Sequence, residues 1–346
     1  MGTSIFLYLN RFNLKLRWLC SSEEARDEAS KMFVKKLNSQ LHCGVMRQDE
    51  YDARLRDNVI TADPGDMQDC NLIIEAAPED ADLKRQILSR LDSAVNAECI
   101  FATNSSSIYA GALIPSVNRK DKLLGLHFFF PVQLKKYVEL ITTAESSEET
   151  VRSVGECLAV IGKKSLHEDL HSAFLLNKLF LDFQAEAYHI SLEGQASFRQ
   201  IDTLVKTHLF PSGVFEFFDH VGIDVMLASV KAYATGRVNF EFYEPLLVKL
   251  QELAGAGHLG LKAKQGFYDY KVQSETGGRQ ISAEVLPYHL AHSLVMRLWD
   301  RYISSVIEVL DGGWISREEL SDAVKDYTGS DDDHFLPPVT LLPPGF

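Results

Sequence analysis

This sequence of 346 residues lacks the features that identify several classes of protein. It contains only five cysteines, which are scattered and show no CxxC or zinc-finger spacing, so neither a disulfide framework nor a metal site is predicted. A reduced, cytoplasmic compartment is therefore expected. Basic residues are also few, with 35 lysines and arginines against 48 acidic residues. The resulting net charge of -13 argues against DNA or RNA as a partner.

Long hydrophobic runs are absent as well. No stretch approaches the length of a membrane-spanning helix, so no membrane partner is predicted, and no leader with a small-residue cleavage site precedes the first structural signals. What is present is the composition of an ordinary globular protein, with 46% hydrophobic and 24% charged residues. The chain is long enough to form two domains.

The first half of the chain alternates predicted strands with predicted helices, which is typical of a parallel α/β sheet. A short apolar block at residues 4–9 precedes them, and Ser22 is placed as the N-cap of the first long helix. The predicted strands are residues 14–19, 71–77, 99–104, 123–129 and 137–142, and the predicted helices are residues 21–41, 81–95 and 148–161.

After residue 169 the pattern changes to long helices, predicted at residues 173–192, 198–207, 221–235 and 244–254. A partial internal repeat is also visible, and its matched helix–Gly–helix layout favours a genuine repeat over chance. At one constant offset, Leu175, Leu179, Gly194, Ser197, Val205 and Lys206 recur as Leu294, Leu298, Gly313, Ser316, Val324 and Lys325. The tail from residue 331 is acidic and then proline-rich, so we expect it to be loosely ordered.

Three groups of polar residues are candidates for chemistry. Asn104 and the serines at 105–107 follow a buried strand, where a parallel sheet presents its ligand crevice, although the stretch on its own favours a helix N-cap. His127 is either a core histidine among phenylalanines or a base whose imidazole Glu139 orients from an antiparallel neighbouring strand. Asn177 interrupts an apolar turn, and a buried amide needs partners, of which a ligand is one.

Several motifs in order, "LIIEAAPED...K", "ATNSSSI", "GLHFFFPV...YVEL", "FLLNKL", "FPSGVFEFFDHVGID" and "HLGLKAKQGFYDYK", together resemble the 3-hydroxyacyl-CoA dehydrogenases of fatty-acid β-oxidation. The resemblance covers roughly residues 1–271, and the tail is similar to the start of the second C-terminal repeat of multifunctional members. It implies a Rossmann-like doubly wound sheet followed by an all-helical C-terminal domain with a partial second helical repeat. The expected segments are an N-terminally incomplete dinucleotide-binding domain (1–169), a helical substrate and dimerisation-type domain (170–273), the partial repeat (274–330) and the tail (331–346).

The resemblance also implies roles for the matching residues. His127 would be the general base that takes the proton of the 3-hydroxyl, and Glu139 would orient its imidazole. Ser106 and Asn177 would hydrogen-bond the reacting oxygen or the thioester carbonyl of an acyl-CoA substrate.

The implied cofactor is NAD. Residues of this sequence that match family positions near it are Gly2, Glu79, Lys84, Asn104, Ser106 and Lys262. Lys35 and Lys36 are candidates for the coenzyme A phosphates, and a solvated helix face explains them equally well.

The sequence departs from the family at its first element. The family begins with a strand and a GxGxxG loop whose amides receive the pyrophosphate, whereas Met1 and Gly2 here match only the end of that motif. We expect either a truncated gene product or, preferably, a misassigned start; a chain that truly starts here should bind the dinucleotide weakly. Because the missing strand is central in such a sheet, its two neighbours should be left unpaired.

Two single residues depart as well. Cys20 stands where an acidic residue would hold the ribose hydroxyls, so the preference for NAD over NADP comes from the family, with Glu23 or Glu24 as substitutes. Phe130 stands where the family has asparagine beside the cofactor, and we expect this change to lower catalytic efficiency.

Two other functions are compatible with the sequence. One is a hydroxy-acid or sugar-acid dehydrogenase with the same serine, histidine, glutamate and asparagine. The other is a non-catalytic paralogue that has lost its dinucleotide loop. Because the partial repeat should cover the helices that pair subunits in the family, we expect a monomer or a weak homodimer. Met296 stands opposite Asn177, so the second copy should be structural only.

Overall fold

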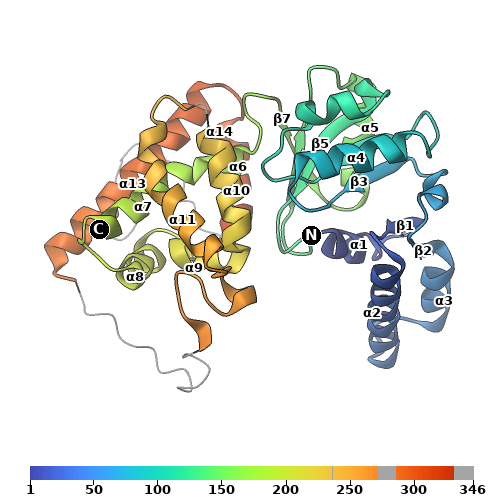
Figure 1. Ribbon diagram of the computed structural model, residues 1–346, viewed down its shortest axis with the longest axis horizontal. Helices are drawn as coiled ribbons and strands as arrows, with labels where there is room; N and C mark the ends of the chain where they lie inside the picture. Colours follow the sequence, from blue (N-terminus) through green and yellow to red (C-terminus); the bar gives the residue numbers. More distant parts are fainter. Residues whose placement is uncertain (236, 272–285, 331–346) are drawn as a thin grey trace. The chain divides into compact units, whose positions relative to one another are not determined.

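The computed structural model describes residues 1–235, 237–271 and 286–330 (Figure 1). It contains two compact units, Met1–Ala173 and Phe174–Phe346, which are treated separately below. The expected tail at 331–346 lies outside the described residues. None of the helices in the described ranges has the length and hydropathy of a membrane-spanning segment.

The first unit is built of strands that alternate with helices, and the predicted α/β pattern is confirmed. Five strands form one sheet in sequence order, parallel except for the antiparallel β5–β6 pair. These strands are β3 (Leu72–Glu75), β4 (Ile100–Thr103), β5 (Leu123–Phe128), β6 (Tyr137–Ile141) and β7 (Lys164–Glu168). The helices are α1 (Gly2–Leu9), α2 (Glu23–His42), α3 (Gln48–Asp57), α4 (Ala81–Asp92) and α5 (Glu148–Val160).

Strands β1 (Leu16–Leu19) and β2 (Asn58–Thr61) form a separate parallel pair. Within the described residues, β1 pairs only with β2 and β3 only with β4, so one edge of each is unpaired, as the sequence predicts. Helix α1 connects the two sheets through side chains. Phe6 contacts Trp18 of β1 with ring centroids 4.9 Å apart, and Tyr8 packs in the core of the larger sheet, where its hydroxyl donates to the Ile161 carbonyl at 2.6 Å. Apolar packing therefore replaces backbone pairing at this break.

The second unit is helical. Its helices are α6 (Leu175–Leu179), α7 (Leu181–Leu192), α8 (Phe198–His208), α9 (Val214–Val221), α10 (Ile223–Ala234), α11 (Glu244–Gly255), α13 (Tyr288–Asp311) and α14 (Arg317–Thr328). The prediction of one helix over 173–192 is wrong, because the chain breaks at Phe180 between α6 and α7. The helix predicted at 221–235 begins only after Gly222, whose φ of 108° ends the unpredicted α9.

The two copies of the sequence repeat have the same local geometry. Gly194 (φ 70°) and Gly313 (φ 68°) end α7 and α13, and Ser197 and Ser316 cap α8 and α14. Helix α13 lies along α7, and its Arg297 donates to carboxylates of the first copy. The second copy thus packs on the helices of the first (Figure 1).

Two buried aspartates account for the "FPSGVFEFFD" and "QGFYDY" motifs. Asp202 accepts from the amides of Phe215 and Glu216, at 3.0 and 2.9 Å, and from the Tyr268 hydroxyl at 2.7 Å. Asp219 accepts from the Tyr268 amide at 3.0 Å. These carboxylates fix the start of α9 and the chain after α11, so part of the family signature is structural.

Asp202 should give the unfolding free energy a measurable pH dependence. Burial raises its pKa to about 6, against an ordinary value of 3.8. Between about pH 4 and pH 6 the folded state therefore keeps a proton that the unfolded state loses, and the contribution of Asp202 to stability falls as pH rises, by about 3 kcal/mol in all. Urea unfolding should show that the difference in unfolding free energy between the natural protein and Asp202→Asn shrinks as pH rises over this range. If the unfolding free energies of the two proteins run parallel with pH, the raised pKa is contradicted.

Candidate active site

His127 and Glu139 form a buried pair on adjacent antiparallel strands. The register of β5 and β6 places them directly opposite each other, and His127 Nδ1 lies 2.6 Å from Glu139 Oε2. Their exposed fractions are 6% and 0%, and the Phe129 ring meets the imidazole edge-on at 4.8 Å between centroids. A carboxylate at Nδ1 selects the tautomer that carries its proton there and stabilises the imidazolium. The geometry is thus that of an oriented base.

Asn104 ties the end of β4 to its neighbours. Its amide donates to the Glu75 carbonyl at 2.7 Å, and its Oδ1 accepts from the Phe128 amide at 2.9 Å, next to His127. No α-helix starts here, so the N-cap interpretation of this stretch is wrong. Residues 106–108 form a bend, and the next helical segment is the 3-10 helix Ala110–Ser116.

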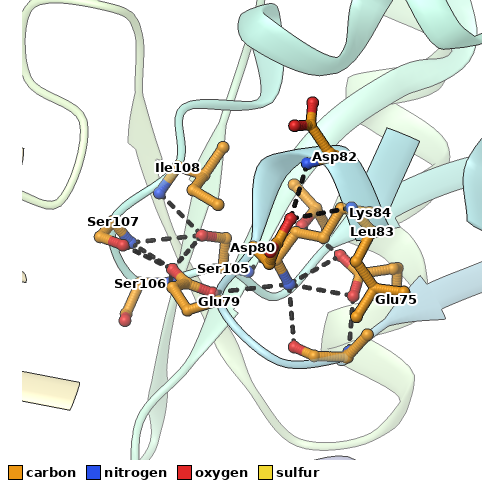
Figure 2. Close-up of polar contacts among 12 residues, drawn as sticks. Glu75, Glu79, Asp80, Asp82, Leu83, Lys84, Ser105, Ser106, Ser107 and Ile108 are labelled. Atoms are coloured by element: carbon orange, nitrogen blue, oxygen red, sulfur yellow. Dashed lines mark hydrogen bonds and ion pairs between the residues drawn. The ribbon is translucent and has the colours of Figure 1, made fainter. Parts of the chain in front are cut away.

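The carboxylate of Glu79 lies in the bend formed by the serines (Figure 2). Its Oε1 accepts from the amides of Ser106 and Ser107, at 3.0 and 2.9 Å, from the Ser107 hydroxyl at 2.7 Å, and from the Ser105 hydroxyl. Burial would raise the pKa of Glu79, but the hydrogen bonds from Ser105 and Ser107 and the charge of Lys84 lower it below its ordinary value. Glu79 therefore fixes the backbone that carries Ser106.

Lys84 and Glu75 form a second buried pair beside this bend (Figure 2). The ammonium lies 3.0 and 3.1 Å from the two Glu75 oxygens, and both side chains are 1% exposed. Thr103 and the Ala77 amide also donate to Glu75, at 2.7 and 2.5 Å, and Lys84 reaches Glu79 at 3.5 Å. Lys84 thus contacts the candidate site through Glu79, a role that its sequence position alone did not indicate.

The residues present fit a dinucleotide at this edge of the sheet. A Cβ on Gly2 would stand 3.5 Å from the Ala76 Cβ, which places the N-terminus of α1 beside the carboxyl end of β3. This is where a pyrophosphate binds in doubly wound folds. Asn104, Ser106 and Glu79 lie at the same edge, after β4 and β3. Together they would hold the nicotinamide half of NAD, and Gly2 the pyrophosphate.

The candidates on α2 lie on its exposed side. Lys35 and Lys36 are exposed, whereas Phe33 and Leu37 of the same helix are buried. Both interpretations of these lysines require this exposure, so the coenzyme A contact stays a prediction. Cys20 follows β1, directly before the α2 cap.

Asn177 and Lys262 belong to the second unit. Asn177 Nδ2 donates to the Tyr233 hydroxyl at 2.9 Å, and its Oδ1 accepts from the Tyr327 hydroxyl at 3.0 Å. Sequence reasoning missed both tyrosines, and Tyr327 comes from the second copy of the repeat. Lys262 pairs with Asp224, with Nζ–O distances of 2.5 and 2.6 Å.

Phe130 is exposed rather than packed in the core. Its exposed fraction is 66%, and it lies in the loop between β5 and β6. The loop is held by Lys163, which sequence reasoning also missed. Its ammonium donates to the carbonyls of Val132 and Lys135 and lies 4.1 Å from the Tyr8 ring centroid.

Comparisons with known proteins identify the family to which this chain belongs. Residues 1–169 match the family model "3-hydroxyacyl-CoA dehydrogenase, NAD binding domain", and residues 174–270 match "3-hydroxyacyl-CoA dehydrogenase, C-terminal domain". A 3-hydroxybutyryl-CoA dehydrogenase of Bradyrhizobium diazoefficiens is 34% identical over 208 residues, which are 60% of this chain and 70% of that protein. The mitochondrial hydroxyacyl-coenzyme A dehydrogenase of Sus scrofa is 32% identical, over 58% of this chain and 64% of its own.

The crystal structure of 3-hydroxybutyryl-CoA dehydrogenase from Escherichia coli is similar in fold, with a TM-score of 0.76 at 19% identity. The match covers 95% of this chain and 86% of that one, so the shared fold includes helices of the second copy.

Proposed function

Because this chain belongs to the 3-hydroxyacyl-CoA dehydrogenase family, an NAD-dependent oxidoreductase family, we propose that it oxidises an L-3-hydroxyacyl-CoA to the 3-oxoacyl-CoA, reversibly. The observation that carries the proposal is the buried pair of His127 and Glu139. His127 lies near the carboxyl end of β5, and Ser106 follows the carboxyl end of the neighbouring strand β4. We further propose a cytoplasmic location. We also propose a monomer or weak homodimer, since α13 covers α7.

His127 accepts the proton of the substrate's 3-hydroxyl at Nε2, while the C–H bond at C3 breaks and the C3–O bond becomes a carbonyl. Bound NAD supplies the hydride acceptor. Glu139 holds the Nδ1 proton and stabilises the imidazolium that forms, and burial strengthens this interaction. Ser106 hydrogen-bonds the reacting oxygen, and Asn177 the thioester carbonyl. In the reverse direction His127 is the acid.

The purified protein given acetoacetyl-CoA and NADH should consume the absorbance of the reduced nicotinamide. A sugar-acid or other small hydroxy acid with NAD is the matched alternative substrate. Turnover of the hydroxy acid alone would favour the sugar-acid dehydrogenase, and no turnover with any acyl-CoA would contradict the proposal.

A further inference from the structure

Five aromatic rings line a pocket in the helical unit. Its walls are Phe180, Phe183, Phe210, Phe217 and Tyr327, with Gln184, Pro211, Ser212, Gly213, Val214 and Thr328 between them. The rings hold one another in place, with centroids 5.1 Å apart for Phe180–Phe210 and 5.3 Å for the stacked Phe180–Tyr327 pair. Pro211 and Ser212 are exposed and form the mouth. The pocket is therefore a preformed, largely apolar site.

This pocket adjoins a residue of the proposed substrate site. The Tyr327 ring forms one of its walls, and the Tyr327 hydroxyl donates to Asn177 Oδ1 at 3.0 Å. Phe180, another wall, follows Asn177 by one helical turn. A thioester carbonyl bound at Asn177 therefore places its acyl chain within reach of the aromatic rings.

Three polar side chains line the pocket, and two of them, Ser212 and Thr328, donate to backbone carbonyls; the third is Gln184. It is 8% exposed, and within the described part of the chain its side chain makes no hydrogen bond. Because this amide lines the pocket and has no partner among the described residues, it can hydrogen-bond an occupant there. None of the described residues that line the pocket is charged, so a carboxylate would find no counter-charge among them.

Building on the proposed function, we propose that the pocket binds the far end of the substrate's acyl chain, and that this end carries a neutral hydrogen-bonding group, a hydroxyl or a carbonyl, for Gln184. The alkyl part lies against the rings, which remove it from water. Helix α14 of the second copy supplies two walls, Tyr327 and Thr328. The second copy is then a specificity element as well as a structural one.

Two substitutions test the pocket with three substrates: acetoacetyl-CoA, a six-carbon 3-oxoacyl-CoA and its terminal hydroxy derivative. Gln184→Leu should lower kcat/KM for the hydroxylated chain about tenfold and raise it for the plain chain, because the amide partner is lost and apolar wall is gained. Thr328→Phe should lower kcat/KM at least tenfold for both six-carbon chains and leave acetoacetyl-CoA within about twofold, since only the longer chains enter the pocket.

Thr207→Phe is the control for the blocking variant. Thr207 and Thr328 both bond the carbonyl of the preceding helical turn, at 2.7 and 2.8 Å, but Thr207 lies outside the pocket. An unchanged preference in Gln184→Leu, or equal losses for all chain lengths in Thr328→Phe, would overturn the inference.

A binding measurement separates this inference from the proposed function. Calorimetry with hexanoyl-CoA and 6-hydroxyhexanoyl-CoA requires no turnover. The natural protein should bind 6-hydroxyhexanoyl-CoA more tightly than hexanoyl-CoA, and Gln184→Leu should lose this difference. That result supports acyl-chain binding in the pocket even if the protein shows no dehydrogenase activity. Equal binding of both chains by the natural protein contradicts the role of Gln184.

Discussion

Replacing His127 by glutamine should lower kcat for acetoacetyl-CoA reduction about a hundred- to ten-thousandfold, the usual contribution of a positioned general acid or base. Glutamine can still hydrogen-bond Glu139 from its amide, so the buried carboxylate keeps a partner. It cannot exchange a proton with the substrate. The fold should survive, and the loss should appear in kcat rather than in KM.

His167→Gln is the matched control for this experiment. His167 lies exposed on β7 of the same unit, and among the described residues its side chain bonds only Ser165, with Oγ–Nε2 3.0 Å apart. Its substitution should leave kcat within about twofold, as for a surface change away from the site. Glu139→Gln should give an intermediate loss, because the orientation of the imidazole is kept and the charge is removed. Equal rates for the natural protein and His127→Gln would remove His127 from the chemistry.

Contacts between neighbouring strands could be predicted from the sequence more readily than contacts between residues far apart in the chain. The antiparallel approach of His127 and Glu139 was predictable, because both residues lie in short apolar strands separated by a single loop. The unpaired edges of β1 and β3 were predictable from the family resemblance, because the central strand that the family's sheet places between them has no counterpart in this sequence. Strand β7 was not, because its sequence "KSLHE" contains one apolar residue, Leu166, and so shows neither apolar–polar alternation nor a buried apolar run.

The partners of the candidate residues were less accessible to sequence reasoning. Tyr327 is 150 positions from Asn177, and no periodicity connects them. Glu79 matched a family position near the ribose, yet its engagement with the serine bend depends on how β3 and β4 end. Lys84 sits on a helix whose pattern suggests an exposed lysine, and only tertiary packing buries it beside Glu75.

Lys84→Met should lower the unfolding free energy of the first unit by about 3–5 kcal/mol, because it leaves the Glu75 carboxylate buried without its counter-charge. The bonds from Thr103 and Ala77 would remain, but they do not neutralise the charge. Glu79 would lose the ammonium that lies 3.5 Å away, so the serine bend should loosen too. Native-state hydrogen exchange of the β3 and β4 amides in urea measures this free energy directly.

Two further variants distinguish the effect of leaving a buried charge unpaired from the effect of losing the packing of the lysine side chain. Lys36→Met removes an exposed lysine of the same unit and should stay within about 0.5 kcal/mol of the natural protein. Adding Glu75→Gln to Lys84→Met should restore part of the stability, because the double variant contains no unpaired charge. A Lys84→Met variant as stable as Lys36→Met would show that Glu75 is protonated or reached by water. In that case the main role of Lys84 is to position Glu79 and the serine bend rather than to stabilise the sheet. The substitution should then leave the hydrogen-exchange rates unchanged and raise KM for NADH.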